Sequence, residues 1–454
     1  MSDTIIAQAT PQGIGGVYIV RISGKKTSIV LKNVLKKFIK PRYAVYSKFF
    51  NFNGDIIDQG IAIWFPSPNS FTGEDVLELQ GHGNNFIVNL LIKNILKIKG
   101  LRLAEPGEFS KRSFLNKKID LIQSESISDL IHSTSEAAVK ASLNSLNGDF
   151  SFYINKIINK VKNLRSIIEV ELNFVDENID LDVECNILNI IKKLIISLKK
   201  TIFISKNSEV LKNGIKIVIA GFPNSGKSSL FNFLSCKRSS IVTNIKGTTR
   251  DLIHSKIILY QQLIELTDTA GLRKTKDKIE NIGINLAKNE INYSNILLFL
   301  IDLSKNKENQ LKKFDNYLKN ISSNIYILLV FNKIDKTFKS YPEIFYYKNV
   351  KSISISIKKK IGLENLYSSL KKYIDKIIKI PQENIFLIRQ RHIKEIKLSL
   401  NELYFAKSEW KINKNYEILA DSLKNVQNFL NKITGKVSSE EILNEIFSNF
   451  CIGK

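Results

Sequence analysis

The residues best suited to chemistry form a glycine-rich loop, Gly221-Phe222-Pro223-Asn224-Ser225-Gly226-Lys227-Ser228. Its G-x-x-x-x-G-K-S spacing allows backbone N–H groups to surround a pyrophosphate, while Lys227 reaches the outer phosphates and the Ser228 hydroxyl ligates Mg²⁺. The apolar run 215–220 precedes the loop, and a segment with helical apolar spacing, 229–234, follows it. A helix that begins there directs the positive end of its dipole toward the anion. The stretch therefore predicts a strand, a phosphate-binding loop and a helix.

Two later motifs indicate that the bound nucleotide is GTP. Asp268-Thr269-Ala270-Gly271 closes the apolar segment 263–266 and offers a carboxylate for the Mg²⁺ shell and a glycine beside the γ-phosphate. Asn332-Lys333-Ile334-Asp335 ends the apolar run 325–331, and its carboxylate can accept two N–H bonds from guanine. Adenine lacks the 2-amino group and would leave that acceptor unpaired, at a cost of about 1 to 3 kcal/mol. The GTP-binding residues predicted in and beside the three motifs are Asn224, Ser225, Gly226, Lys227, Ser228, Ser229, Asp268, Thr269, Ala270, Gly271, Asn332, Lys333, Ile334 and Asp335.

The composition limits the class of protein. The 454 residues and the 43% hydrophobic content suffice for several domains with their own cores. The longest apolar runs are strand-sized, well below the roughly 20 residues that span a bilayer, and the N-terminus lacks the features of a secretion signal. The three cysteines, Cys185, Cys236 and Cys451, are scattered, which fits a reducing compartment. We therefore expect a cytoplasmic protein without membrane segments.

The formal net charge of +25 has two readings. Lysines attract nucleic acid because they release counterions from phosphates, which would fit an RNA partner. The lysines are also spread through every region together with abundant Ile and Asn, and an AT-rich genome produces the same pattern. The charge alone establishes no partner.

Apolar spacing predicts the strands and helices that must position these residues. Residues 1–118 combine turn-rich segments with one amphipathic helix, 85–97, and the predicted strands are 5–10, 16–22, 61–65 and 75–80. Helical spacing dominates from 120 to 213, most clearly over 154–172, and it resumes after Pro381 over 393–405 and 416–430. Helical stretches on both sides of a nucleotide domain predict one discontinuous helical domain, into which the nucleotide domain is inserted.

Further motifs, spread over the whole chain, resemble those of the bacterial tRNA uridine-modification GTPases, the MnmE or TrmE family. They are Asp3-Thr4-Ile5, Ala7-Gln8-Ala9-Thr10-Pro11, Pro68-Asn69-Ser70-Phe71-Thr72-Gly73-Glu74-Asp75, Gly81-His82-Gly83, Pro106-Gly107-Glu108-Phe109 and the terminal Phe450-Cys451-Ile452-Gly453-Lys454. The resemblance implies a multidomain fold of α+β and α/β parts. These are an α+β folate-binding and dimerisation domain (1–118), a discontinuous all-α helical domain (119–213 and 381–454) and an inserted Ras-like P-loop G domain (214–380).

The resemblance also implies an activity. Together with an FAD-dependent flavoprotein partner of the MnmG (GidA) type, the family adds a (carboxymethyl)aminomethyl group at C5 of the wobble uridine of certain tRNAs. The one-carbon unit comes from a tetrahydrofolate derivative of the 5-formyl or methylene type. The family assembles as a homodimer and, with the flavoprotein, as a heterotetramer.

Residue-to-motif transfer places Arg21, Glu78, Lys118 and the terminal Lys454 on folate-contacting positions. Taken alone, each of these residues would be interpreted as surface charge. Cys451 is either a catalytic thiol or a packed or incidental cysteine, and the sequence leaves both interpretations open.

The nucleotide domain resembles the potassium-activated subclass of such GTPases. A loop of carbonyls, Thr243-Asn244-Ile245-Lys246-Gly247-Thr248-Thr249, joins the GTP-binding residues, and the implied K⁺ ligands are Asn224, Thr243, Ile245 and Thr248. A K⁺ there would place positive charge near the bridging phosphate oxygen, as an arginine finger does elsewhere. Thr249 would be the second hydroxyl ligand of Mg²⁺ beside Ser228. Because Leu272 occupies the place of the usual water-orienting glutamine, Glu280 is the implied catalytic residue.

One motif departs from the family pattern: the loop that normally reads Ser-Ala-Lys and packs on guanine is Ser356-Ile357-Lys358 here. The rival function is a ribosome-assembly or RNA-binding GTPase switch without modification chemistry. A KH-type Gly-x-x-Gly helix pair would favour it, and none is evident after Pro381. A structural scaffold for the flavoprotein is a third interpretation. The folate-type motifs and the Cys-Ile-Gly-Lys tail favour modification.

Overall fold

The computed structural model describes residues 3–173, 181–236, 253–260, 262–268, 290–318, 325–337, 341–378, 386–437, 439–448, 450–451 and 453. Two compact units divide the chain. The first joins residues 1–132, 142–199 and 390–454, and the second joins residues 133–141 and 200–389. These units are not the four segments predicted from the sequence, whose boundaries remain a prediction.

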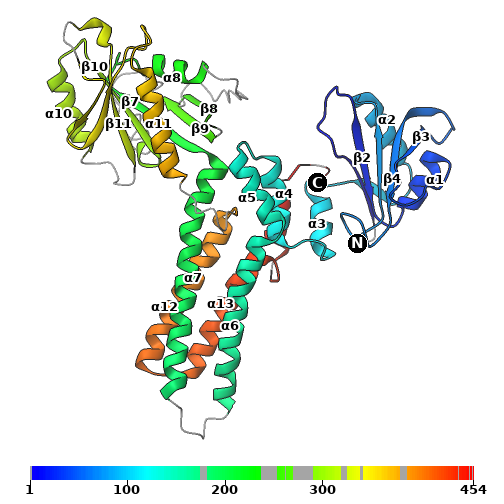
Figure 1. Ribbon diagram of the computed structural model, residues 1–454. Coiled ribbons are helices and arrows are strands. Elements are labelled where there is room, and N and C mark those ends of the chain that lie inside the picture. The colour runs from blue at the N-terminus through cyan, green and yellow to red at the C-terminus, as the bar shows by residue number, and fades with distance from the viewer. Residues whose placement is uncertain are drawn as a thin grey trace, which may run out of the picture. The chain divides into compact units, whose positions relative to one another are not determined.

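A mixed sheet forms the N-terminal part of the first unit, and its described strands follow the order β3-β4-β5-β2-β1-β6 (Figure 1). The strands are β1 (Thr4–Gln8), β2 (Tyr18–Ser23), β3 (Val45–Phe50), β4 (Ile56–Phe65), β5 (Val76–Gly81) and β6 (Leu101–Leu103), and the helices are α1 (Thr27–Leu35), α2 (Asn85–Ile95) and α3 (Glu108–Leu115). Tyr18, Val20 and Ile22 alternate along β2 and are buried in one core with residues of α1 and α2. Because strand side chains alternate between faces, Arg21 of β2 lies on the opposite face.

Helices make up the rest of the first unit, and α13 packs against both α6 and α12 (Figure 1). The helices of this region are α4 (Leu121–Ile131), α5 (Glu136–Leu146), α6 (Asp149–Asn173), α7 (Leu181–Asn213), α12 (Gln390–Ile412), α13 (Tyr416–Thr434) and α14 (Glu440–Ser448). Residues 136–141 of α5 and 200–213 of α7 belong to the second unit. The predicted helices 154–172, 393–405 and 416–430 lie within α6, α12 and α13.

A buried ion pair fixes the start of α12 to α4. Arg391 Nη2 lies 3.0 Å from Glu125 Oε2, and the buried His392 places its Nε2 2.8 Å from the same oxygen. Arg391 Nη1 also donates to the Lys432 carbonyl at the end of α13, at 2.7 Å. Helices that precede and follow the second unit in sequence therefore share one buried polar centre, as a discontinuous helical domain requires.

The second unit is built on a mostly parallel sheet, whose described strands follow the order β12-β13-β11-β10-β7-β9-β8. The strands are β7 (Ile215–Gly221), β8 (Ile253–Leu259), β9 (Gln262–Asp268), β10 (Ile296–Asp302), β11 (Tyr326–Asn332), β12 (Ile344–Tyr347) and β13 (Val350–Ser354), and the helices are α8 (Lys227–Cys236), α10 (Lys307–Leu318) and α11 (Leu363–Ile377). Ile217 and Ile219 belong to one core cluster and Val218 and Ala220 to another. Both faces of β7 are thus buried over residues 217–220, which explains the unbroken apolar stretch after Lys216.

Candidate functional site

The phosphate loop connects β7 to α8 in the conformation that its glycines permit. Asn224 adopts a left-handed conformation with φ of 63°, and Gly226 has φ of 98°. A Cβ at Gly226 would collide with the side-chain amide of Asn332, so this position requires glycine. Lys227 Nζ donates to the carbonyls of Gly221 at 3.0 Å and Phe222 at 2.9 Å, so its ammonium group closes the loop.

The motif at the end of β11 is bonded directly to the phosphate loop. Asn332 Nδ2 donates to the Ser225 carbonyl at 2.9 Å, and Lys333 Nζ donates to the Asn224 carbonyl at 2.6 Å. Since β7, β10 and β11 are parallel neighbours, their carboxyl ends meet at one edge of the sheet. The structure thereby brings together two motifs that the sequence analysis assigned to one site.

Asp335 follows in a short 3₁₀ helix, Ile334–Lys336, and it is held by the loop after β13. Ser356 Oγ donates to Asp335 Oδ1 at 2.5 Å, and the Lys359 N–H donates to Ser356 Oγ at 3.1 Å. The hydrogen bond from Ser356 lowers the pKa of Asp335, so the carboxylate stays charged and able to accept N–H bonds. The loop 356–358 therefore lies beside Asp335, in agreement with its predicted alignment.

Asp268 is fully buried at the end of β9, where it pairs with Ile219 of β7 just before the phosphate loop. Ser228 and Ser229 are exposed in the first turn of α8. A carboxylate and a hydroxyl at this edge are the oxygen donors that Mg²⁺ prefers. The other candidates of this site, Thr243, Asn244, Ile245, Lys246, Gly247, Thr248, Thr249, Thr269, Ala270, Gly271 and Glu280, lie outside the described residues.

The sequence analysis did not identify Asp302 as a site residue. Asp302 ends β10 and holds the side chain of Lys333 in the site. Its Oδ2 lies 2.7 Å from Lys333 Nζ, and its Oδ1 accepts from Ser304 Oγ at 2.6 Å. Burial by itself would raise the pKa of Asp302, but the hydrogen bonds from Lys333 and Ser304 lower it. The available signal was its position, because an acidic residue that ends a buried parallel strand lies at the carboxyl edge where ligands bind.

A second group of candidates meets on the face of the N-terminal sheet opposite to α1 and α2. Arg21 Nε lies 2.9 Å from Glu78 Oε1, and the guanidinium lies over the rings of Phe71 and Phe109, 5.6 and 5.8 Å from their centroids. Arg21 Nη1 also donates to the Gly453 carbonyl at 3.4 Å. Arg21 from the N-terminal part and Gly453 from the C-terminal tail therefore meet within one chain.

The C-terminal tail is held against the N-terminal part by its backbone. The Gly107 N–H donates to the Cys451 carbonyl at 3.4 Å, and Gly453 has φ of 92°. A Cβ at Gly453 would collide with the carbonyl of Gln8. Cys451 is exposed, and Lys454 lies outside the described residues. The aliphatic chain of Lys118 borders Gly73, in the loop that carries Phe71.

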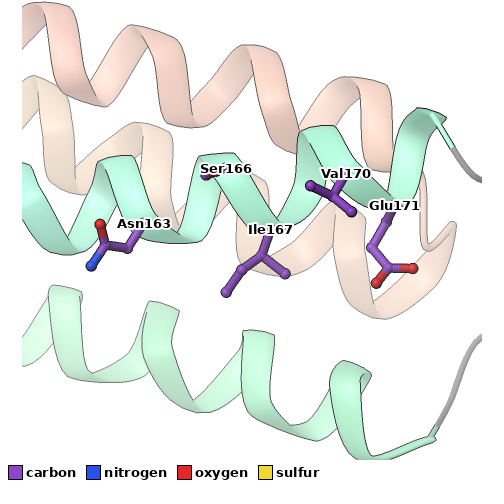
Figure 2. Close-up of a pocket in the computed structure, with 5 residues that line it drawn as sticks. All are labelled: Asn163, Ser166, Ile167, Val170 and Glu171. Carbon is purple, nitrogen blue, oxygen red and sulfur yellow. The ribbon is translucent and has the colours of Figure 1, made fainter.

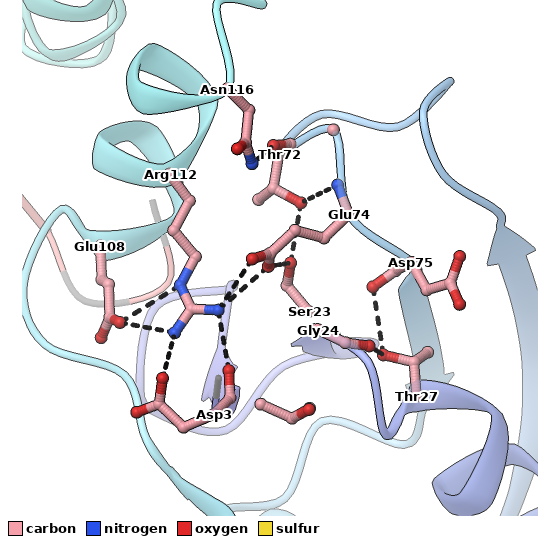
Figure 3. Close-up of polar contacts among 12 residues, drawn as sticks. Asp3, Ser23, Gly24, Thr27, Thr72, Glu74, Asp75, Glu108, Arg112 and Asn116 are labelled. Carbon is pink, nitrogen blue, oxygen red and sulfur yellow. Dashed lines mark hydrogen bonds and ion pairs between the residues drawn. The ribbon is translucent and has the colours of Figure 1, made fainter. Parts of the chain in front are cut away.

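Several residues of the family motifs form a buried polar network around Arg112 (Figure 3). Its guanidinium lies 2.9 Å from Glu108 Oε1, 3.0 Å from Glu74 Oε2 and 3.4 Å from Asp3 Oδ1. Ser23 Oγ donates to Glu74 Oε2 at 2.7 Å. Asp3, Glu74 and Glu108 therefore stabilise the loop that carries Phe71 and the start of α3.

The helical region has a small surface pocket of about 370 Å³ on α6. Figure 2 shows its described lining residues, which are Asn163, Ser166, Ile167, Val170 and Glu171. They offer no cation to a phosphate, so the pocket is unsuited to a nucleotide.

The parallel sheet, the phosphate loop after β7 and the guanine-type motif after β11 define the second unit as a P-loop GTPase domain. Two family models match the chain: "GTP-binding protein TrmE N-terminus" over residues 4–118 and "MnmE helical domain" over residues 121–451. The chain belongs to the MnmE family of tRNA modification GTPases.

Curated relatives named tRNA modification GTPase MnmE match over the full length. The relative from Buchnera aphidicola subsp. Baizongia pistaciae is 47% identical over 460 residues, which cover 100% of this chain and 99% of the relative. The relative from Shewanella sp. strain MR-7 is 42% identical over 454 residues, which cover 100% of each chain. A solved structure of Era from Aquifex aeolicus is 24% identical and covers 41% of this chain and 66% of that chain, with a TM-score of 0.27. The fold class of the second unit rests on its own strand order and on the phosphate loop that follows β7.

Within the part of the chain that the structure describes, we find no helix with the length and apolar character needed to cross a membrane.

Proposed function

We propose that this protein couples GTP hydrolysis to the addition of a (carboxymethyl)aminomethyl group at C5 of the wobble uridine in certain tRNAs. The observation that carries the proposal is the meeting of the Arg21–Glu78 pair with the tail at Gly453. A GTPase switch without modification chemistry has no need of this arrangement. The names of the full-length relatives support tRNA as the substrate.

The site around Arg21 suits a reduced folate. The exposed Phe71 beside the Arg21 guanidinium offers a ring to a flat pterin, the buried Phe109 supports Arg21 from within the fold, and Glu78 accepts N–H bonds. Lys118 and Lys454 supply cations for the anionic tail of the folate. When bound, a 5-formyl or methylene tetrahydrofolate supplies the one-carbon unit, and we propose Cys451 as the thiol that acts beside it.

The GTP site suits a metal-assisted hydrolysis. Lys227 and the loop N–H groups bind the phosphates, and Ser228, Thr249 and the buried Asp268 provide oxygens around Mg²⁺. K⁺, when bound, adds positive charge near the bridging oxygen, with Asn224, Thr243, Ile245 and Thr248 as its ligands. Glu280 orients the attacking water.

We also propose the assembly of the family for this chain, a homodimer that forms a heterotetramer with an FAD-dependent partner of the MnmG type. Oxidation chemistry at the uridine requires a redox cofactor, and a flavin in the partner would supply it. Cytoplasmic location follows from the tRNA substrate.

Analysis of the modified nucleosides in tRNA tests the proposal. Cells that lack this protein should lose the C5 modification of the wobble uridine, and the wild-type gene should restore it. Unchanged wobble uridine modification in the deletion strain would instead favour the GTPase switch.

A further inference from the structure

The GTPase sheet carries a basic and aromatic cavity of about 680 Å³ at the edge opposite the phosphate loop. Its walls are the beginnings of β11 and β13, the turn between β12 and β13, and the last turns of α11. The phosphate loop follows the carboxyl end of β7, whereas this cavity lies at the amino ends of parallel strands. It is therefore separate from the nucleotide site.

Three lysines line this cavity: Lys351, Lys372 and Lys376. No ion pair involves any of them within the described ranges, and Asp375 is the one carboxylate among the described lining residues. Burial and the charges of Lys372 and Lys376 lower the pKa of Lys351. Clustered like charges destabilise a fold, and an anionic ligand removes that cost.

Three tyrosines lie among the lysines. Tyr326 and Tyr373 are stacked with ring centroids 5.1 Å apart and an interplanar angle of 26°. Tyr373 is anchored because its hydroxyl donates to the Ile327 carbonyl at 3.3 Å, and burial raises its pKa to about 12. Tyr346 is 70% exposed, so its ring is free to stack on a ligand. Rings held in place beside cations are the combination that binds single-stranded nucleic acid.

We propose that this cavity binds single-stranded RNA, with the three lysines on backbone phosphates and Tyr346 stacked on a base. A membrane surface is flat and does not enter a concave site, and an acidic protein segment has no use for the aromatic rings. The proposal stands on the chemistry of the cavity, and it rests on the proposed function only in the choice of tRNA as a second probe.

Binding of the full-length protein to labelled RNA tests the site. The probes are a single-stranded oligonucleotide of about 12 residues and unmodified tRNA, each titrated at several salt concentrations from roughly 50 to 200 mM. The triple variant Lys351→Gln/Lys372→Gln/Lys376→Gln should bind the oligonucleotide about tenfold more weakly. Its log–log salt slope should fall by about two, since each single-strand phosphate contact contributes about 0.7. Tyr346→Ala should weaken binding about fivefold or more, and Tyr346→Phe should not, because it keeps the ring.

A second triple variant provides the matched control. Lys156→Gln/Lys160→Gln/Lys162→Gln removes the same charge from exposed positions of α6 and should bind RNA within about twofold of wild type. All variants should hydrolyse GTP at the wild-type rate, which also verifies folding. If both triple variants lose the same RNA affinity, RNA is attracted by the general positive charge of the surface, and the proposal is overturned. Wild-type RNA affinity in the cavity variant would also overturn it, as would binding of the cavity to phosphatidylglycerol vesicles in place of RNA. None of these outcomes changes the expected result of the nucleoside assay in the deletion strain, so the RNA site and the proposed function are tested independently.

Discussion

Asp335 illustrates how a base-reading side chain is prepared before its ligand arrives. Ser356 Oγ accepts a hydrogen bond from the Lys359 N–H, and the Ser356 hydroxyl in turn donates its hydrogen to Asp335 Oδ1. The hydrogen bond from Ser356 thereby fixes the orientation of the Asp335 carboxylate. Preorganisation of this kind reduces the ordering cost of binding.

The substitution Asp335→Asn should shift the base preference from guanine toward xanthine. The amide oxygen takes the position that accepts from Ser356, so the amide N–H faces the base, where xanthine presents a carbonyl and guanine an N–H. GTP affinity should fall at least about tenfold, because bonds to a charged acceptor contribute about 1.5 to 3 kcal/mol each. Binding of GTP and XTP measured side by side checks this.

Asp315→Asn is the control for this exchange, because Asp315 is ion-paired with Lys348 on the surface and does not contact the nucleotide motifs. It should leave both affinities unchanged. If Asp335→Asn binds XTP no better than wild type does, Asp335 does not read the base.

At the scale of elements, the sequence predicted what depends on local spacing. The strand before the phosphate loop and the helix after it are β7 and α8, and the predicted helices match α6, α12 and α13. The helix α14 was missed, because its nine residues are too short to show a sustained period.

Arg112 could not be predicted, although it is buried at the centre of the polar network that holds the loop carrying Phe71. It is one of 68 basic residues, and its neighbours in sequence resemble any exposed helix. Its environment arises from carboxylates at positions 3, 74 and 108, which only the tertiary fold brings together. Lys351, Lys372 and Lys376 of the basic cavity were not predicted for the same reason, because only the tertiary fold brings them together.

Replacing this arginine should expose the dependence of the N-terminal part on one cation. Arg112→Met leaves Glu74 and Glu108 without their shared partner and should lower the free energy of unfolding by about 3 to 5 kcal/mol. Arg165→Met removes an exposed pair with Glu169 and should cost at most about 0.5 kcal/mol. Urea denaturation of both variants gives the comparison.

The same network predicts a pH dependence. Burial opposes the shift, but bonds from Arg102 and Arg112 lower the pKa of Glu108, and the bond from Arg102 lowers the pKa of Asp3. The unfolded chain therefore binds protons first, so this stability is present above pH of about 4 and is lost as the pH falls through the folded pKa values. Arg112→Met should flatten that acid slope, and an unchanged slope would contradict the role assigned to the network.

At the scale of the whole molecule, the two units hold different candidate chemistries. The nucleotide motifs lie in the second unit, and the Arg21 site and the tail lie in the first. Each unit has its own core. In the first unit, α1 and α2 cover one face of the sheet, and in the second unit α8 and α11 cover one face of the sheet. An activity in one unit can therefore be removed without unfolding the other.

Removal of the tail residues 451–454 should separate the two activities. The tail meets Arg21 and Gly107 but belongs to no core strand, so GTP hydrolysis should stay at the wild-type rate while folate binding and tRNA modification are lost. Cys451→Ser distinguishes thiol chemistry from placement, since a serine variant with normal modification rules out the thiol alone. Gly453→Ala tests placement, because the added Cβ meets the Gln8 carbonyl at a φ of 92°. Gly54→Ala is its match, with φ of 96° and open space around the position, and it should modify tRNA normally. A protein without the tail that still modifies tRNA would defeat the assignment of the tail to the site.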